Sequence, residues 1–183
     1  SIAVLAQNGY RVIAPDQIGF CKSSKPAAYQ FSFAQLAHNT QALLQSLDIE
    51  QATIIGHSMG GMLASRFALN HPQMVDQLVL VNPIGLEDYR RMVPYKSLEE
   101  LYQEELKRTE AGIRDYHKTY YTSWKPTYDE WVRIPAAQLR SPDYPQVALV
   151  SAHTYAMIYE QPVVYEFSDL KMPVLVVIGL EDR

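Results

Sequence analysis

Residues 53–61 read Thr-Ile-Ile-Gly-His-Ser-Met-Gly-Gly, and this stretch decides the fold. It begins with β-branched apolar residues, passes through Ser58 between Gly56 and Gly60, and continues into a helix-like sequence. That order predicts a strand, a sharp turn and a helix, with Ser58 at the turn in a strained backbone conformation. Side chains in place of the two glycines would crowd the neighbouring strand and helix. A serine that projects from such a turn is placed to act as a nucleophile.

The predicted helix after this turn gives Met59 a possible role as well. The helix would aim its first amides at the serine, so the backbone N–H of Met59 is a candidate donor to an oxyanion. By itself, the Gly-x-Ser-x-Gly pattern also fits a glycine-rich turn without chemistry, because glycine and serine are common residues. The rest of the chain therefore has to decide between these interpretations.

The composition indicates one domain with a proper core and excludes several functions. The chain has 183 residues, of which 48% are hydrophobic. Its 16 basic and 20 acidic residues are mixed along the chain, so we expect no nucleic-acid partner. No apolar run is long enough to span a membrane. The single cysteine, Cys21, excludes an internal disulfide framework, and we expect no metal or organic cofactor. The sequence leaves the compartment and the oligomeric state open.

Strand and helix patterns alternate along the first 83 residues. Such alternation predicts a parallel sheet with helices on both faces. The expected elements are a helix end at 2–7, a strand at 10–14, a loop at 16–26, a helix at 32–47, a strand at 52–55, a helix to about residue 70 and a strand at 77–81.

The helix at 32–47 has the clearest signals of these elements. Ser32 and Gln35 fit a capping box, and Phe31 with Leu36 fits a hydrophobic staple. Apolar residues recur every three or four positions, which predicts one buried face. We expect this helix to be scaffold.

The character of the sequence changes at residue 84. Residues 84–170 hold both tryptophans and eleven of the thirteen tyrosines, and prolines divide them into short pieces without a clear strand. This pattern predicts a helical insertion, or lid, over the strand ends, with core segments at 1–83 and 171–183 and a returning strand at 173–179. An apolar or aromatic pocket is favoured, although packing also explains most of the residues concerned: Met92, Trp124, Trp131, Tyr155, Met157 and Tyr159.

Four separated stretches resemble parts of the α/β-hydrolase family. They resemble, in order, the loop after the family's fourth strand (15–26), its nucleophile elbow (56–61), its sixth strand (78–83) and its seventh strand with the acid turn (176–182). The resemblance implies an α/β-hydrolase fold with a lid and the chain order nucleophile, acid, histidine. Ser58 then matches the nucleophile and Asp182 the acid that orients the histidine. Glu181 and, less well, Glu87 are alternative acids.

The chain departs from the family's pattern in two places. The loop after the fourth strand has Cys21 where the family often has glycine. No histidine follows Asp182, and none of the five present is a good base: His38, His57, His71, His117 and His153. The family's third strand and the loop that gives its second oxyanion donor are also missing. We therefore expect this sequence to be an internal segment of a longer protein, with the catalytic histidine beyond Arg183.

The mechanism implied by the resemblance is acyl transfer to Ser58, followed by hydrolysis of the acyl-enzyme by water. The leading expectation is a serine hydrolase that cleaves carboxylic esters with small-to-medium, apolar or aromatic groups. Carbon–carbon bond hydrolases, amidases, peptidases and perhydrolases share the fold and stay open. Ser58 argues against epoxide hydrolases and haloalkane dehalogenases, which use a carboxylate at the elbow. A ligand-binding protein that keeps the fold without turnover is the alternative from another class.

Overall fold

The computed structural model describes residues 2–26 and 28–180. Its strands are β1 (Ala52–His57), β2 (Val75–Val81) and β3 (Val174–Val177). Its α-helices are α1 (Ile2–Gln7), α2 (Phe33–Ser46), α3 (Met59–Asn70), α4 (Leu98–Leu106), α5 (Glu110–Lys118), α6 (Asp129–Gln138) and α7 (Tyr144–Glu160). Four short 3-10 helices complete the set: η1 (Pro72–Met74), η2 (Tyr89–Arg91), η3 (Pro126–Tyr128) and η4 (Val164–Asp169).

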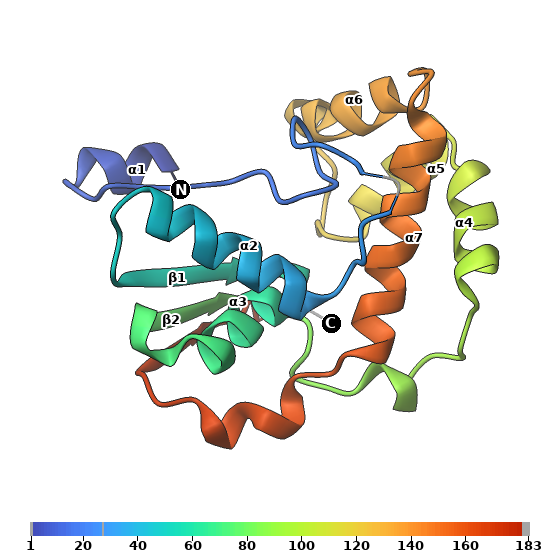
Figure 1. Cartoon of the computed structure of the whole chain (residues 1–183). Helices are drawn as coiled ribbons and strands as arrows, with labels where there is room; N and C mark the ends of the chain where they lie inside the picture. Colours follow the sequence, from blue (N-terminus) through green and yellow to red (C-terminus); the bar gives the residue numbers. More distant parts are fainter. Residues whose placement is uncertain (1, 27, 181–183) are drawn as a thin grey trace.

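The described strands form one parallel sheet in the order β1-β2-β3 (Figure 1). Ile54 pairs with Leu78, and Leu78 pairs with Val174. Parallel neighbours need a crossover connection, which α3 supplies between β1 and β2. The carboxyl ends of β1 and β2 therefore lie at the same edge of the sheet, where Ser58 follows β1.

Helices α2 and α3 pack together against the sheet, as the apolar periodicity of α2 predicts. The main core joins α2 and α3 to the inward residues of β1 and β2, and its fully buried members include Phe67 and Leu78. On the opposite face, Ile55, Leu175 and Val177 stay 53%, 57% and 46% exposed. Within the described residues, then, helices cover one face of β1 and β2, whereas both faces of β3 are exposed.

The start of α2 matches the prediction in part. Ser32 is the N-cap, and its hydroxyl accepts a hydrogen bond from the Gln35 amide at 3.0 Å. The reciprocal bond of a capping box is absent here, because the Gln35 side chain donates to Asn39 Oδ1 at 3.1 Å instead. Only the Gln35 amide therefore gains a side-chain acceptor, whereas a full capping box would also supply one to the Ser32 amide.

The strand expected at 10–14 is wrong. Residues 10–17 form no regular element, and Figure 1 draws them as a loop after α1. A short β-branched run becomes a strand only when a neighbour accepts and donates its backbone hydrogen bonds. Among the residues that the structure describes, β1, β2 and β3 pair only with one another, so the segment has no such neighbour.

Helices α4 to α7 lie between β2 and β3 in the sequence and beside the sheet in space (Figure 1). Helix α4 packs on α7, and α5 packs on α6 around Ile113, Val132 and Ala136. Helix α7 joins this group to the start of α2 through Met157 and Ile158, which share a buried cluster with Phe33 and Leu36. None of the described helices combines the length and the apolar character that a membrane-crossing segment needs.

An ion pair ties α3 to the segment that leads into β3. Arg66 donates from Nη2 to Glu166 Oε1 at 2.6 Å and from Nη1 to Oε2 at 2.8 Å, across 100 positions of sequence. The Arg66 side chain is 17% exposed and that of Glu166 is 41% exposed. Bidentate geometry makes this pair stronger than an ordinary surface pair. The hydrogen bonds from Arg66 lower the pKa of Glu166, against a smaller opposing effect of burial.

We expect Glu166→Gln to lower the free energy of unfolding by about 1 kcal/mol at neutral pH, since the Glu166 side chain is 41% exposed and solvent screening limits the gain. Because the pKa of Glu166 is lower in the folded protein, its contribution is present above the ordinary glutamate pKa and is lost as the pH falls through the folded value. Urea unfolding of wild type and variant at neutral pH and near pH 3 measures the destabilisation and its loss at low pH. If the free energies of unfolding of wild type and variant differ as much near pH 3 as at neutral pH, the stabilising role of the ionised Glu166 is contradicted.

The control is Glu104→Gln. Glu104 pairs with Lys96 at 2.7 Å, but both side chains are about half exposed, at 55% and 45%. We expect this variant to change the free energy of unfolding by less than about 0.5 kcal/mol.

Candidate active site

Ser58 lies at the turn between β1 and α3, as the sequence predicts. Its backbone angles are φ 52° and ψ −126°, a conformation that residues with a side chain rarely adopt. The residue immediately before it ends β1 and the residue after it begins α3. The strand, sharp turn and helix predicted from residues 53–61 are thereby confirmed.

Backbone hydrogen bonds hold this strained residue from two sides. The Ser58 amide donates to the Val81 carbonyl at 3.2 Å, and the Ile84 amide donates to the Ser58 carbonyl at 3.2 Å. The Gly61 amide donates to the same Ser58 carbonyl at 2.8 Å. The backbone of Ser58 is therefore held by the first turn of α3, by the last residue of β2 and by the segment that follows β2. In the described part of the chain, no hydrogen bond is formed by the Ser58 hydroxyl.

The space around the two elbow glycines is unequal. A Cβ at Gly56 would lie 2.2 Å from the Gly60 carbonyl oxygen and 2.7 Å from the Ala64 Cβ, so no side chain fits there. A Cβ at Gly60 would meet no atom within 4 Å. The expectation that a Cβ at Gly60 would be crowded is therefore wrong, since it is the Gly60 backbone that fills the space beside Gly56.

The sequence analysis missed a second tight glycine in the elbow. A Cβ at Gly61 would lie 2.6 Å from the Cβ of Pro83, because the segment after β2 passes directly over the first turn of α3. The signal in the sequence was the doubled Gly60-Gly61, in which only the first glycine belongs to the Gly-x-Ser-x-Gly pattern.

Met59 is the first residue of α3, so its amide has no acceptor within the helix. This position is the one that the oxyanion assignment requires, and the assignment itself stays a prediction. The Met59 side chain packs against a buried apolar cluster that includes Met157 and Val163, and Tyr89 packs against the same cluster. The side of the elbow that faces the helices after β2 is therefore apolar.

None of the five histidines forms a described hydrogen bond with Ser58. His153 stacks on Phe31 with ring centroids 5.1 Å apart, and burial lowers its pKa. His71 is the C-cap residue that follows α3, where burial lowers its pKa and the nearby charge of His38 lowers it further. His117 lies on α5, where burial and then the charge of Arg108 lower its pKa. His57 ends β1 with its side chain exposed.

Asp182 and its alternative Glu181 lie outside the described residues, so the structure leaves both as predictions. Strand β3 leads toward them, and Gly179 is tied to the end of β2, where its amide donates to Asn82 Oδ1 at 2.9 Å. The other alternative acid, Glu87, lies in the loop after β2 and lines a cavity.

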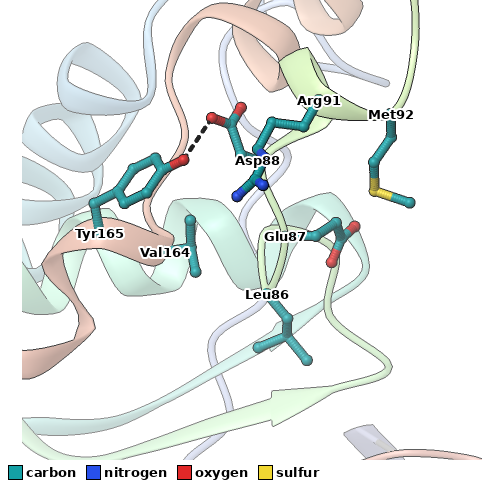
Figure 2. Close-up of a pocket in the computed structure, with 7 residues that line it drawn as sticks. All are labelled: Leu86, Glu87, Asp88, Arg91, Met92, Val164 and Tyr165. Carbon is teal, nitrogen blue, oxygen red and sulfur yellow. Dashed lines mark hydrogen bonds between the residues drawn. The ribbon is translucent and has the colours of Figure 1, made fainter.

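This cavity has a volume of about 310 Å³ and adjoins a buried carboxylate that the sequence reading missed (Figure 2). Its lining residues come from the loop after β2, with η2, and from η4: Leu86, Glu87, Asp88, Arg91, Met92, Val164 and Tyr165. Asp88 is 8% exposed and accepts hydrogen bonds from Arg90 Nε at 2.9 Å, Arg90 Nη2 at 2.8 Å and Tyr165 Oη at 2.8 Å. The Arg90 bonds hold the pKa of Asp88 well below its usual range. Asp88 thus joins the two segments that line the cavity.

The aromatic and methionine residues expected to line a pocket divide into two groups. Met157 is buried in a core cluster, and Trp124 packs on Tyr121 and Tyr128, so both have packing roles. Of the other four, Met92 lines the cavity, Tyr159 is partly buried against Tyr95, and Trp131 and Tyr155 are 54% and 41% exposed.

The loop after residue 15 contains Cys21, which is exposed and has a φ of +43°. A left-handed φ favours glycine, which gives a physical reason for the residue that this position often has in the resembling family. In the described ranges, no three His, Cys, Asp or Glu side chains gather in a way that could hold a metal ion.

The chain is similar in sequence and in structure to known proteins. A sequence profile described as alpha/beta hydrolase fold matches residues 1–183. The crystal structure of a probable hydrolytic enzyme from Pseudomonas aeruginosa PAO1 is 54% identical, with a TM-score of 0.95 over 99% of this chain and 59% of that one. A 2-hydroxymuconate semialdehyde hydrolase of Pseudomonas putida is 42% identical over 42% of this chain and 27% of its own length.

Another relative matches the whole of this chain at lower identity. The 2-hydroxy-6-oxo-6-phenylhexa-2,4-dienoate hydrolase of Comamonas testosteroni is 27% identical over 100% of this chain and 64% of its own length. The chain thus spans less than two thirds of the length of each of these relatives. With the profile match over residues 1–183 and the strand–serine–helix elbow in place, the chain belongs to the α/β-hydrolase family.

Proposed function

We propose that this chain is the nucleophile-bearing part of a serine hydrolase that forms an acyl-enzyme on Ser58. The observation that carries the proposal is the strained backbone of Ser58 at the start of α3, held by hydrogen bonds on both sides. Such a turn exposes a serine hydroxyl and places the first helical amide, that of Met59, beside it. The oxyanion role of Met59 and the acid role of Asp182 are parts of this proposal.

The chemistry proposed at this site has two steps. The Ser58 oxygen attacks a carbonyl carbon while a histidine takes the hydroxyl proton, and the negative charge that develops on the carbonyl oxygen is stabilised by the Met59 amide. The leaving group departs with a proton from the histidine, and water then hydrolyses the acyl-enzyme. Asp182 would orient this histidine, which we propose to lie outside the present sequence.

Carboxylic esters are the first substrate class that we propose. An ester presents a carbonyl carbon and a good leaving group to Ser58, and the apolar surroundings of Met59 favour an apolar or aromatic acyl group.

Carbon–carbon bond hydrolysis is the second candidate, and the names of the relatives favour it. Proteins named as hydrolases of 2-hydroxymuconate semialdehyde and of 2-hydroxy-6-oxo-6-phenylhexa-2,4-dienoate match 42% and 100% of this chain. We propose such vinylogous oxo acids as the alternative substrate class for Ser58.

Turnover by the natural full-length protein tests the two candidates directly. A short-chain nitrophenyl ester and 2-hydroxy-6-oxo-6-phenylhexa-2,4-dienoate are compared by kcat/KM, and a fluorophosphonate with mass spectrometry locates the labelled serine. Label at Ser58 with faster ester cleavage supports an esterase, and label with faster dienoate cleavage supports a carbon–carbon bond hydrolase. A protein that takes no label and turns over neither substrate contradicts the proposal and favours the ligand-binding alternative.

A further inference from the structure

The last residue of β2 and the three residues after it contact both the nucleophile and the end of β3. On one side, the Val81 carbonyl accepts from the Ser58 amide at 3.2 Å and the Ile84 amide donates to the Ser58 carbonyl at 3.2 Å. On the other side, the Asn82 amide donates to the Val177 carbonyl at 2.7 Å. The order β1-β2-β3 makes this possible, because β2 lies between the strand that leads to Ser58 and the strand that leads to Gly179.

Asn82 makes the second contact with β3 through its side chain. Its Oδ1 accepts a hydrogen bond from the Gly179 amide at 2.9 Å, across 97 positions of sequence. Asn82 has a φ of +38°, a left-handed conformation that few residues with a side chain adopt and that asparagine tolerates best. The backbone amide and the side-chain oxygen of one residue thus bind β3 at Val177 and just beyond its end at Gly179.

We propose that Asn82 is a positioning residue that sets the start of the acid turn relative to Ser58. This inference rests on the proposed function, in which the turn after Gly179 supplies the acid Asp182. Ser58 is hydrogen-bonded to Val81 and Ile84, and Gly179 is hydrogen-bonded to Asn82, so the two halves of the site share the four-residue segment 81–84. Pro83, the next residue, restricts that segment and packs over Gly61 of the nucleophile helix.

Losing the Asn82 oxygen frees Gly179 while Ser58 keeps its own contacts. The acid turn would then move relative to the nucleophile, and the histidine that it orients would follow. Misplacement of a catalytic group by about 1 Å costs about 100-fold in rate. A histidine that loses a close carboxylate also loses a stabiliser of its charged form, so its pKa falls. The effect is therefore expected in kcat and in the pH profile, because the change acts on the proposed catalytic groups.

Three variants of the natural full-length protein test the proposal. Asn82→Gly keeps the left-handed backbone and removes the oxygen, and Asn82→Asp keeps an acceptor at the same place. Asp48→Gly is the control, because Asp48 has a φ of +56° and lies before the start of β1, whereas Ser58 follows its end. Hydrogen exchange of residues 177–180 reads the bond to Gly179 without reference to activity.

For Asn82→Gly we expect faster exchange at 177–180, a 10- to 100-fold lower kcat, a KM within about twofold and a low-pH limb of kcat/KM that moves to lower pH. Asn82→Asp should restore kcat to within about threefold of wild type, and Asp48→Gly should match wild type. An Asn82→Gly protein with wild-type kcat and pH profile overturns the inference, as does an Asn82→Asp protein as slow as Asn82→Gly. A separate measurement tests the proposed function itself. If Ser58 of the wild-type protein is not labelled by a fluorophosphonate, the proposed function fails.

Discussion

Replacing Ser58 with alanine is expected to lower kcat for ester or dienoate cleavage by about 10⁵-fold, because the acyl-enzyme can no longer form. The residual rate would come from the oxyanion donors and from substrate binding alone. Affinity for a non-hydrolysable substrate analogue should stay within about threefold, since the hydroxyl contributes little to ground-state binding. Steady-state kinetics measures kcat, and calorimetric titration measures the affinity. Fluorophosphonate labelling tests whether the reactive serine has been lost.

Ser65→Ala is the matched control. Ser65 lies on α3, seven residues after Ser58, and its buried hydroxyl has no described hydrogen-bond partner. Removing an unsatisfied buried hydroxyl costs little stability, so this variant should keep wild-type kcat and label. A Ser58→Ala protein that retains turnover would show that another group is the nucleophile.

Replacing Gly56 with alanine is expected to lower the free energy of unfolding by about 3 kcal/mol or more. The new methyl group would lie 2.2 Å from the Gly60 carbonyl oxygen and 2.6 Å from the Gly60 carbonyl carbon. Both contacts are with backbone, which no side-chain rotation relieves. Strand β1 and helix α3 would have to separate, and the packing of Ala64 would be lost with them.

Gly60→Ala is the matched variant for this prediction. Its Cβ meets no atom within 4 Å, and alanine favours the helix by about 1 kcal/mol over glycine. We expect Gly60→Ala to be neutral or slightly stabilising, and urea unfolding of both variants measures the difference. Equal destabilisation by the two substitutions would refute the unequal packing of the elbow.

Local patterns in the sequence predicted the elements that carry the site. The β-branched run before Gly56 and the apolar periodicity after Ser32 are signals within a few residues, so β1, the elbow and α2 followed from them. The strand at 10–14 failed for the opposite reason. Its residues have β-propensity, but a strand also requires a neighbour, and propensity says nothing about which neighbour is present.

In the candidate site, too, the sequence predicted the residues of a local motif and missed those that depend on distant partners. Ser58, Met59 and Gly56 belong to one continuous motif, which the sequence contains in full. Asn82 and Asp88 were missed because their partners, Gly179 and Tyr165, are 97 and 77 positions away. A single sequence does not show which residues far apart in the chain are in contact. It also does not show whether a polar residue such as Asp88 is buried or exposed.

The sequence by itself determined the family, the strand–serine–helix turn and the helical character of the region between β2 and β3. These depend on hydrophobic period, turn residues and caps, all of which act over short distances. Only the tertiary structure decided that Gly56 is crowded while Gly60 is open, and that the residues after β2 connect Ser58 to the end of β3. Those features depend on the distance between segments far apart in the chain, which parallel pairing and close packing set once the whole sheet has formed.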